Sequence, residues 1–160
     1  MEYLDLYYIE NDKLTGETMV RGGEVPEGRY FNVVICYMEN SNGEFLIQRA
    51  SIQKGHKCSS TGGHVQSGQT LKEAMVREIK EEIGIDVSED ELEFKGRWLK
   101  NNVVMCNAYY MKRNIDINEC ELQEEEVESV FWKTKEEIEE MIKNDEFFET
   151  GAKLFEDFIR

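Results

Sequence analysis

Residues 63–85 read GHVQSGQTLKEAMVREIKEEIGI, and the spacing of the apolar side chains predicts an amphipathic helix over residues 70–83. The apolar positions recur every four residues and form a stripe suited to face a core; they are Leu71, Met75, Ile79 and Ile83. Gly84 follows where a helix commonly ends on a left-handed residue. The glycine pair at residues 62–63 predicts a loop that leads into this helix.

Three glutamates lie on one side of the predicted helix. Glu78, Glu81 and Glu82 are spaced i, i+3 and i+4, which places their carboxylates close together. They lie toward one edge of the apolar stripe, so we expect all three to be half-buried. Like charges at this spacing repel, and half-buried ones need a compensating cation. Carboxylate oxygens suit Mg²⁺ or Mn²⁺, so the cluster predicts a metal site.

The stretch resembles the Nudix box of the Nudix hydrolases. That pattern reads glycine, five residues, glutamate, seven residues, and then Arg-Glu-apolar-any-Glu-Glu-any-Gly-apolar. The positions that match in register are Gly63, Arg77, Glu78, Ile79, Glu81, Glu82, Gly84 and Ile85. One position departs, because Gln69 stands where the family has its first glutamate.

The resemblance implies the chemistry of the site. Family members cleave a diphosphate linkage by attack of water on phosphorus, with divalent metal ions as cofactors. Carried over by position, Glu78, Glu81 and Glu82 would hold Mg²⁺ or Mn²⁺ and serve catalysis, and the Gly63 carbonyl would be a further ligand. The implied partner is a small-molecule diphosphate, of the nucleoside-diphosphate type or another organic diphosphate.

The remaining box residues are expected to be structural. The family's arginine more often orients a box glutamate than contacts phosphate, and we favour that role for Arg77. Gln69 keeps a carbonyl acceptor for Arg77 but loses the charge, so this contact should be weaker than in the family. Gly84 is expected to cap the helix.

Candidates outside the box are less specific. Several members of the family use an acidic residue in a late loop as a base, and Glu126, in the acidic run 124–126, is our candidate; a solvated loop is the alternative. Arg49, at the end of a predicted strand, and His64, beside Gly63, are candidates for binding the substrate. Lys54 could contact phosphate, although a solvated lysine is the simpler interpretation.

Two alternatives to a hydrolase stay open. Residues 2–7, which read EYLDLY, and the run from Gln48-Arg49 to residues 62–65, GGHV, also resemble isopentenyl-diphosphate-isomerase-like Nudix proteins. The isomerase, however, has a cysteine directly before its Gly-His pair. Here Gly62 holds that position, and Cys58 is several residues earlier. The isomerase also has a pair of metal-binding histidines near its N-terminus that this chain lacks. A Nudix-fold binding module is the other alternative, and the retained box glutamates argue against it.

Composition limits the class of protein. The chain has 160 residues, is 40% hydrophobic and 33% charged, and carries a formal net charge of −15. Such a chain is expected to form a globular domain, and its charge argues against binding a nucleic-acid polymer. No apolar run is long enough to span a membrane. The N-terminus lacks a signal-peptide pattern and the four cysteines lack metal-type spacing, so we expect free thiols and a cytoplasmic location.

The order of predicted elements indicates an α/β (α+β) fold. Strands are expected at 3–9, 31–38, 44–49, 91–99, 103–112 and 127–132, with helices at 70–83, 135–144 and 146–159. Residues 10–28 are expected to be loop, with a short strand or a turn as the alternative, and residues 50–61 a polar connection. The resemblance implies a Nudix-type α/β/α sandwich with a mixed sheet, the box helix and C-terminal helices. We expect residues 1–28 to form an N-terminal extension packed on a Nudix domain at 29–160. Many members of the family are dimers, so a homodimer is an expected state.

Overall fold

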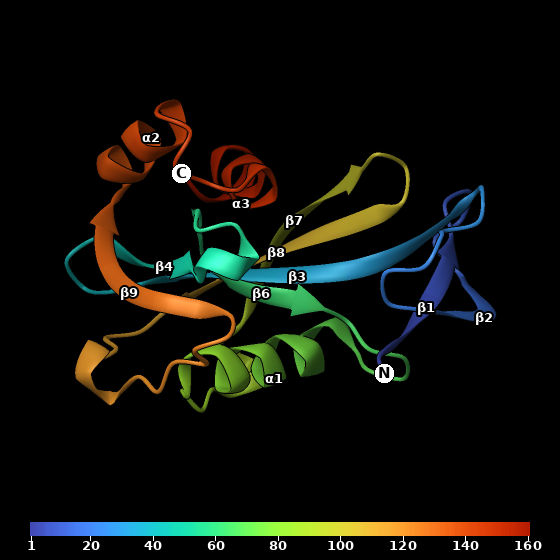
Figure 1. The fold of residues 1–160 in the computed structure, drawn as a ribbon, viewed down its shortest axis with the longest axis horizontal. Helices are drawn as coiled ribbons and strands as arrows, with labels where there is room; N and C mark the ends of the chain where they lie inside the picture. The colour runs from blue at the N-terminus through green and yellow to red at the C-terminus, as the bar shows by residue number, and fades with distance from the viewer.

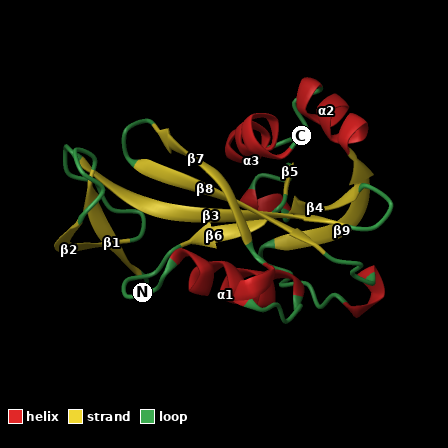
Figure 2. Cartoon of the chain, turned by 180° about the vertical axis from the view of Figure 1, so that it is seen from behind, coloured by secondary structure: helices red, strands yellow, loops and turns green.

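A mixed sheet with helices on both faces forms the body of the protein, as a computed structural model covering residues 1–160 shows (Figure 1). Helix α1 (Leu71–Ile83) covers one face. Helices α2 (Lys135–Lys143) and α3 (Glu149–Leu154) cover the other, followed by a π-helical turn, η4 (Phe155–Ile159). The view from behind shows the same three layers (Figure 2). The predicted α/β/α sandwich is confirmed.

Strand β3 (Arg29–Glu39) organises the sheet. It runs parallel to β8 (Val104–Lys112) on one side and antiparallel to β6 (Thr61–His64) on the other. The other strands extend these pairs: β7 (Glu93–Lys100) pairs with β8, and β4 (Glu44–Ala50) pairs with β5 (Cys58–Ser59) and β9 (Val127–Thr134). Strand β5 lies in the predicted connection at 50–61, and β6 includes the glycine pair 62–63 that the sequence predicts to be a loop, so both strands are additions to the prediction.

Two apolar cores hold the layers together. Met75, Ile79 and Ile83 of α1 are fully buried against one face of the sheet, as the four-residue stripe predicts. On the opposite face, Phe155 packs with Tyr37 and Phe45 at ring-centroid distances of 5.4 and 5.7 Å. Burial of such large aromatic side chains contributes strongly to stability. Helices therefore pack on both faces of the sheet through buried apolar side chains, which fixes the position of α1.

Local sequence sets the bounds of α1. Thr70 accepts a hydrogen bond from the Glu73 amide while the Glu73 side chain accepts one from the Thr70 amide, which makes a capping box. At the other end Gly84 has a φ of 74° and its amide donates to the Lys80 carbonyl. The left-handed end expected at Gly84 is therefore confirmed.

The N-terminal residues form a hairpin, so residues 10–28 contain the short strand that the sequence analysis gives as the alternative to loop. Strand β1 (Tyr3–Tyr8) pairs with β2 (Leu14–Val20), and the hairpin joins the sheet through the pair of Tyr7 with Tyr30. It lies at the end of the molecule away from α2 (Figure 1). The predicted C-terminal helix at 146–159 is also divided, because α3 ends at Leu154 and η4 continues it.

No helix combines the length and apolar character needed to cross a bilayer.

Candidate active site

Helix α1 presents its three glutamates unequally. Glu78 and Glu82 are buried, each with 8% of its surface exposed, whereas the Glu81 side chain is 49% exposed. The expectation that all three are half-buried is therefore wrong. Glu78 and Glu82 lie on the side of α1 that faces β6, and Glu81 lies further round the helix toward solvent. The site therefore contains two buried carboxylates, those of Glu78 and Glu82, and one exposed carboxylate, that of Glu81.

The Arg77 guanidinium ties the box together. Its Nη1 donates to Glu78 Oε1 and to Glu81 Oε2, both at 3.0 Å, and its Nη2 donates to the His64 carbonyl at 2.9 Å. Nη2 also lies 3.3 Å from Gln69 Oε1, at the long end of the hydrogen-bond range. The buried Nε has no partner. Arg77 thus fixes two carboxylates against the loop that precedes the helix.

Glu82 has partners that the sequence analysis missed. The Gln48 side chain on β4 donates to Glu82 Oε1 at 3.1 Å, and Thr61 Oγ1 fixes that amide by donating to Gln48 Oε1 at 2.8 Å. The Gly62 amide also donates to Glu82 Oε1, at 3.3 Å. Neutral donors rather than cations therefore hold this buried carboxylate.

Burial shifts the protonation of both carboxylates. Loss of water raises the pKa of Glu78 to about 7, opposed in part by the Arg77 charge. Loss of water raises the pKa of Glu82 to about 8, with the Gln48 hydrogen bond opposing it. A nearby cation stabilises the charged form of a buried carboxylate, because its attraction compensates for the lost hydration.

The residues present fit a hard divalent cation in their chemistry. The cavity gathers the carboxylates of Glu78, Glu81 and Glu82 beside the backbone of Gly63, and carboxylate and carbonyl oxygens are the ligands that Mg²⁺ prefers. A Cβ atom at position 63 would lie 2.6 Å from Glu78 Oε2, so glycine alone leaves room for that carboxylate. In this conformation no three acidic, histidine or cysteine side chains converge at metal-binding spacing. Arg77 donates to Glu78 and Glu81, and Gln48 donates to Glu82.

Two adjoining cavities lie beside these carboxylates. The first, of about 250 Å³, has no hydrophobic lining residue and contains all three box glutamates. The second, of about 320 Å³, extends toward β3 and the start of α3, where Val33, Phe148 and Thr150 line it. Both cavities share six residues, which are Arg21, Gly62, Gly63, His64, Glu82 and Glu126. The polar first cavity therefore opens into the second cavity, which is lined by both polar and apolar residues.

Two of the candidates that lie outside helix α1, Glu126 and His64, line the cavities. Glu126 lines both cavities together with Glu82. His64 lines both as well, and its ring stacks on Phe31 with centroids 5.6 Å apart. Burial, aided by the Arg21 charge, lowers the pKa of His64 to about 4, so its imidazole is neutral near pH 7.

Arg49 is not brought to the site. Its Nη1 donates to the His56 carbonyl at 3.0 Å, and it lines neither cavity. Two other cations are present instead. Lys54 lies in the second cavity with its Nζ 3.3 Å from Glu126 Oε1. Arg21 lines both cavities and pairs with Glu2 at 2.8 Å.

The N-terminal hairpin delivers Arg21 by docking on the box loop. Glu2 accepts a hydrogen bond from the Gln66 side chain at 2.9 Å. Asp5 accepts two more, from the Ser67 hydroxyl at 2.6 Å and the Gly68 amide at 3.0 Å. No local signal in residues 10–28 predicts this placement, because it depends on pairing between segments far apart in sequence.

The position of Cys58 bears on the isomerase alternative. Cys58 is fully buried in the core on β5 and lines neither cavity. Burial raises the pKa of its thiol. A buried, protonated thiol is a poor reactive group.

Comparison with known proteins gives the family. The model of the NUDIX domain matches residues 29–158. The Nudix hydrolase lmo0368 of Listeria monocytogenes is 30% identical over 153 residues, covering 92% of this chain and 88% of that protein. An isopentenyl-diphosphate Delta-isomerase of Salmonella heidelberg is 33% identical, but over 34% of this chain and 32% of the isomerase.

A solved structure agrees over the whole chain. The crystal structure of DR0079 from Deinococcus radiodurans has a TM-score of 0.80 and 25% sequence identity, covering 99% of this chain and 100% of that one. The match therefore includes the N-terminal hairpin as well as the sandwich. With the domain match and the Listeria relative, it shows that this chain belongs to the Nudix family of hydrolases, enzymes that act on pyrophosphate bonds.

Proposed function

We propose that this protein is a divalent-metal-dependent hydrolase that cleaves a diphosphate linkage in a small organic diphosphate, of the nucleoside-diphosphate type or a related one. The observation that carries the proposal is the cavity of about 250 Å³ without hydrophobic lining, in which Glu78 and Glu82 are buried beside Gly63. Two desolvated carboxylates with raised pKa values are unfavourable by themselves and become favourable beside a cation. Perturbed carboxylates in a cleft are typical of catalytic sites.

The proposed metal ligands are the box glutamates and one backbone oxygen. Glu78, Glu81, Glu82 and the Gly63 carbonyl would hold Mg²⁺ or Mn²⁺. When bound, the metal neutralises phosphate charge and lowers the pKa of a coordinated water. Glu126 is the proposed general base, because it lines the same cavity as Glu82 from a separate loop.

Three further residues keep this arrangement in place. Arg77 orients Glu78 and Glu81 through its two 3.0 Å hydrogen bonds. Gln69 supports Arg77 through the longer 3.3 Å contact, and Gly84 ends the helix that carries the carboxylates. We assign these residues structural roles in the site.

The two cavities suggest how the substrate lies. The diphosphate would lie where they meet, between Arg21 and Lys54, which supply the positive charge that an acidic protein otherwise lacks here. The organic group would extend into the second cavity toward Phe148 and Thr150. His64, neutral and stacked on Phe31, offers a hydrogen-bonding imidazole. Contact of Arg49 with the substrate stays a prediction, since its guanidinium now lies at the His56 carbonyl.

Residues 1–28 are proposed to act as an extension of the Nudix domain at 29–160, because they supply Arg21 to the site. The net charge of −15 favours a small substrate with bound cations over a nucleic-acid polymer. The homodimer and the cytoplasmic location stay predictions.

A substrate panel tests the proposal. Nucleoside di- and triphosphates, nucleotide sugars, dinucleotide cofactors and isoprenoid diphosphates are incubated with the protein and Mg²⁺ or Mn²⁺. We expect release of phosphate or nucleotide that a chelator abolishes. Glu82→Gln should lower turnover by about 10²–10³-fold, the effect of losing one charge-stabilising group. Glu156→Gln, an exposed glutamate on η4, is the matched control and should leave turnover unchanged.

Each alternative has its own outcome in this panel. Hydrolysis that survives Glu82→Gln contradicts the proposal. Isomerisation of isopentenyl diphosphate without release of phosphate would indicate the isomerase, against which the buried Cys58 argues. Tight binding without turnover would indicate a binding module.

A further inference from the structure

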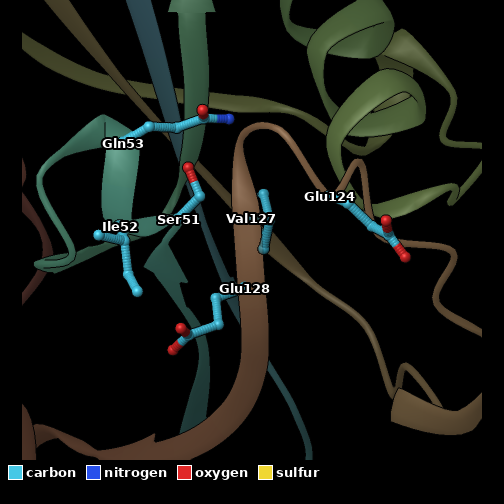
Figure 3. A pocket seen from close by; sticks show the side chains of 6 residues that line it. All are labelled: Ser51, Ile52, Gln53, Glu124, Val127 and Glu128. Atoms are coloured by element: carbon cyan, nitrogen blue, oxygen red, sulfur yellow. The ribbon is translucent and has the colours of Figure 1, made fainter.

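A short segment after β4 holds the backbone of the acidic loop. The Ser51 amide donates to the Glu126 carbonyl at 3.0 Å, and the Ser51 hydroxyl donates to the Glu125 carbonyl at 2.8 Å. The Gln53 side chain donates to the same Glu125 carbonyl at 3.2 Å. Figure 3 shows Ser51 and Gln53 extending from their segment toward the chain before Val127. Two consecutive peptide carbonyls are thus fixed by one neighbouring segment.

The acidic loop needs this anchor because it lies beyond the sheet. The ladder between β4 and β9 runs from Glu44 and Thr134 to Ala50 and Val127, and it stops there. Residues 124–126 form a turn outside the strands. On its other side the loop is attached to α1, where the Gln123 amide donates to the Glu82 carbonyl at 3.0 Å. The loop is therefore held between the metal-site helix and residues 51–53.

Side-chain contacts continue the attachment on either side of Val127. Lys54 Nζ lies 3.3 Å from Glu126 Oε1, and His56 Nε2 lies 3.0 Å from Glu128. The register between β4 and β9 shifts at Arg49 and Ala50, so Glu128 is the extra residue of a β-bulge. Bulges next to active sites commonly re-aim a side chain. Here the bulge lies two residues after Glu126.

We propose that Ser51 and Gln53 are positioning residues that hold the Glu126 carboxylate in the cavity beside Glu82. The inference rests on the proposed role of Glu126 in catalysis. Ser51 and Gln53 act on the peptide carbonyls and not on the substrate, and neither donates to a box glutamate. Without their side chains the 124–126 turn keeps the Ser51 amide contact but loses both side-chain contacts to the Glu125 carbonyl. The carboxylate would then sample a wider range of positions, and a displacement of about 1 Å can cost about a hundredfold in rate.

The test compares kinetics and backbone protection in matched variants. Ser51→Ala combined with Gln53→Ala should lower kcat by about tenfold to a hundredfold on the panel member with the highest turnover, with little change in KM. Amide hydrogen exchange, measured on the protein alone, should become faster at residues 124–127 and stay unchanged in α1. Ser41→Ala is the control, because it removes a comparable hydroxyl contact, at 2.9 Å to Asn114, in a turn away from both cavities.

A double-mutant cycle separates positioning from general destabilisation. Residues that act through one group are non-additive, so in a Glu126→Gln background the Ser51→Ala and Gln53→Ala changes should cause no further loss of kcat. An additive further loss overturns the inference, as does full activity of the Ser51→Ala, Gln53→Ala protein when Glu126→Gln alone is impaired. Full activity of Glu126→Gln, or no turnover of any panel member by the unaltered protein, overturns the proposed role of Glu126 together with this inference.

Discussion

Replacing Gly63 with alanine should abolish most activity while leaving the protein folded. The added Cβ would lie 2.6 Å from Glu78 Oε2 and closer still to Glu78 Cδ and Oε1, whereas an ordinary contact is about 3.4 Å, so the carboxylate must retreat by about 1 Å. The obstructing atoms belong to the end of a flexible side chain, which can move without disturbing the backbone. A misplacement near 1 Å of a catalytic group costs about a hundredfold in rate, or roughly 2.7 kcal/mol of barrier.

The neighbouring glycine supplies the contrast. A Cβ at Gly62 would lie 2.8 Å from Ile35 Cγ1 and 3.1 Å from Ile35 Cα, and it would meet the Val34 carbonyl. These atoms belong to the central strand β3 or lie against it, so Gly62→Ala should unfold the protein or lower its melting temperature sharply. Gly16→Ala is the control for glycine replacement as such. Gly16 has a φ of 82° but nothing within 4 Å of its added Cβ, so stability should fall slightly and activity should stay.

The assay combines initial rates on the best substrate of the panel with thermal unfolding of each variant. We expect Gly63→Ala to keep a melting temperature close to that of the unaltered protein and to lose about a hundredfold in kcat. Full activity in Gly63→Ala would refute the reasoning, because it would mean that Glu78 is free to move without cost. Loss of folding in Gly63→Ala would refute it as well, because the three atoms nearest to the new methyl group are all side-chain atoms of Glu78.

Three further predictions concern the surroundings of the site. Gln69→Glu places a charge beside Arg77, 3.3 Å from its Nη2, and should raise the free energy of unfolding by about 1 kcal/mol in urea titrations; a rise in turnover above tenfold would show that the glutamine limits catalysis. Tyr37→Phe removes the 2.7 Å hydrogen bond that the buried Tyr37 hydroxyl donates to the Gly151 carbonyl in α3, so urea unfolding should show a loss of about 1 kcal/mol, and an unchanged midpoint would contradict this. Burial, with the Asp12 hydrogen bond, raises the pKa of Tyr30 to about 12, so the folded state binds its proton more tightly. The contribution of the Tyr30 proton to the free energy of unfolding is complete below pH 10 and is lost as the pH rises toward 12. Between pH 10 and 12 the free energy of unfolding of Tyr30→Phe should therefore fall less steeply than that of the unaltered protein.

Local sequence determined the helix of the site almost completely. The four-residue apolar stripe, Thr70 with Glu73, and Gly84 set its buried face and its two ends, because caps and periodicity act within a few residues. The spacing of the glutamates likewise placed their carboxylates on one side without reference to the rest of the chain. It did not determine their burial, because Glu81 turns toward solvent and only the packing of α1 on β6 decides which side is covered.

Tertiary structure decided which polar residues surround that helix. Gln48 and Arg49 are adjacent on β4, and side chains alternate between the faces of a strand, so only one of them can face α1. The sequence analysis names Arg49 as the candidate, but in the structure it is the Gln48 side chain that donates to Glu82. Arg21 and Lys54 reach the site through contacts between segments distant in sequence, with Glu2 and Glu126 as their partners. The sequence by itself determined helix α1, the spacing of its glutamates and the family. The residues that surround this helix were decided by the register of the sheet and the docking of the N-terminal hairpin, because both depend on pairing between segments far apart in the chain.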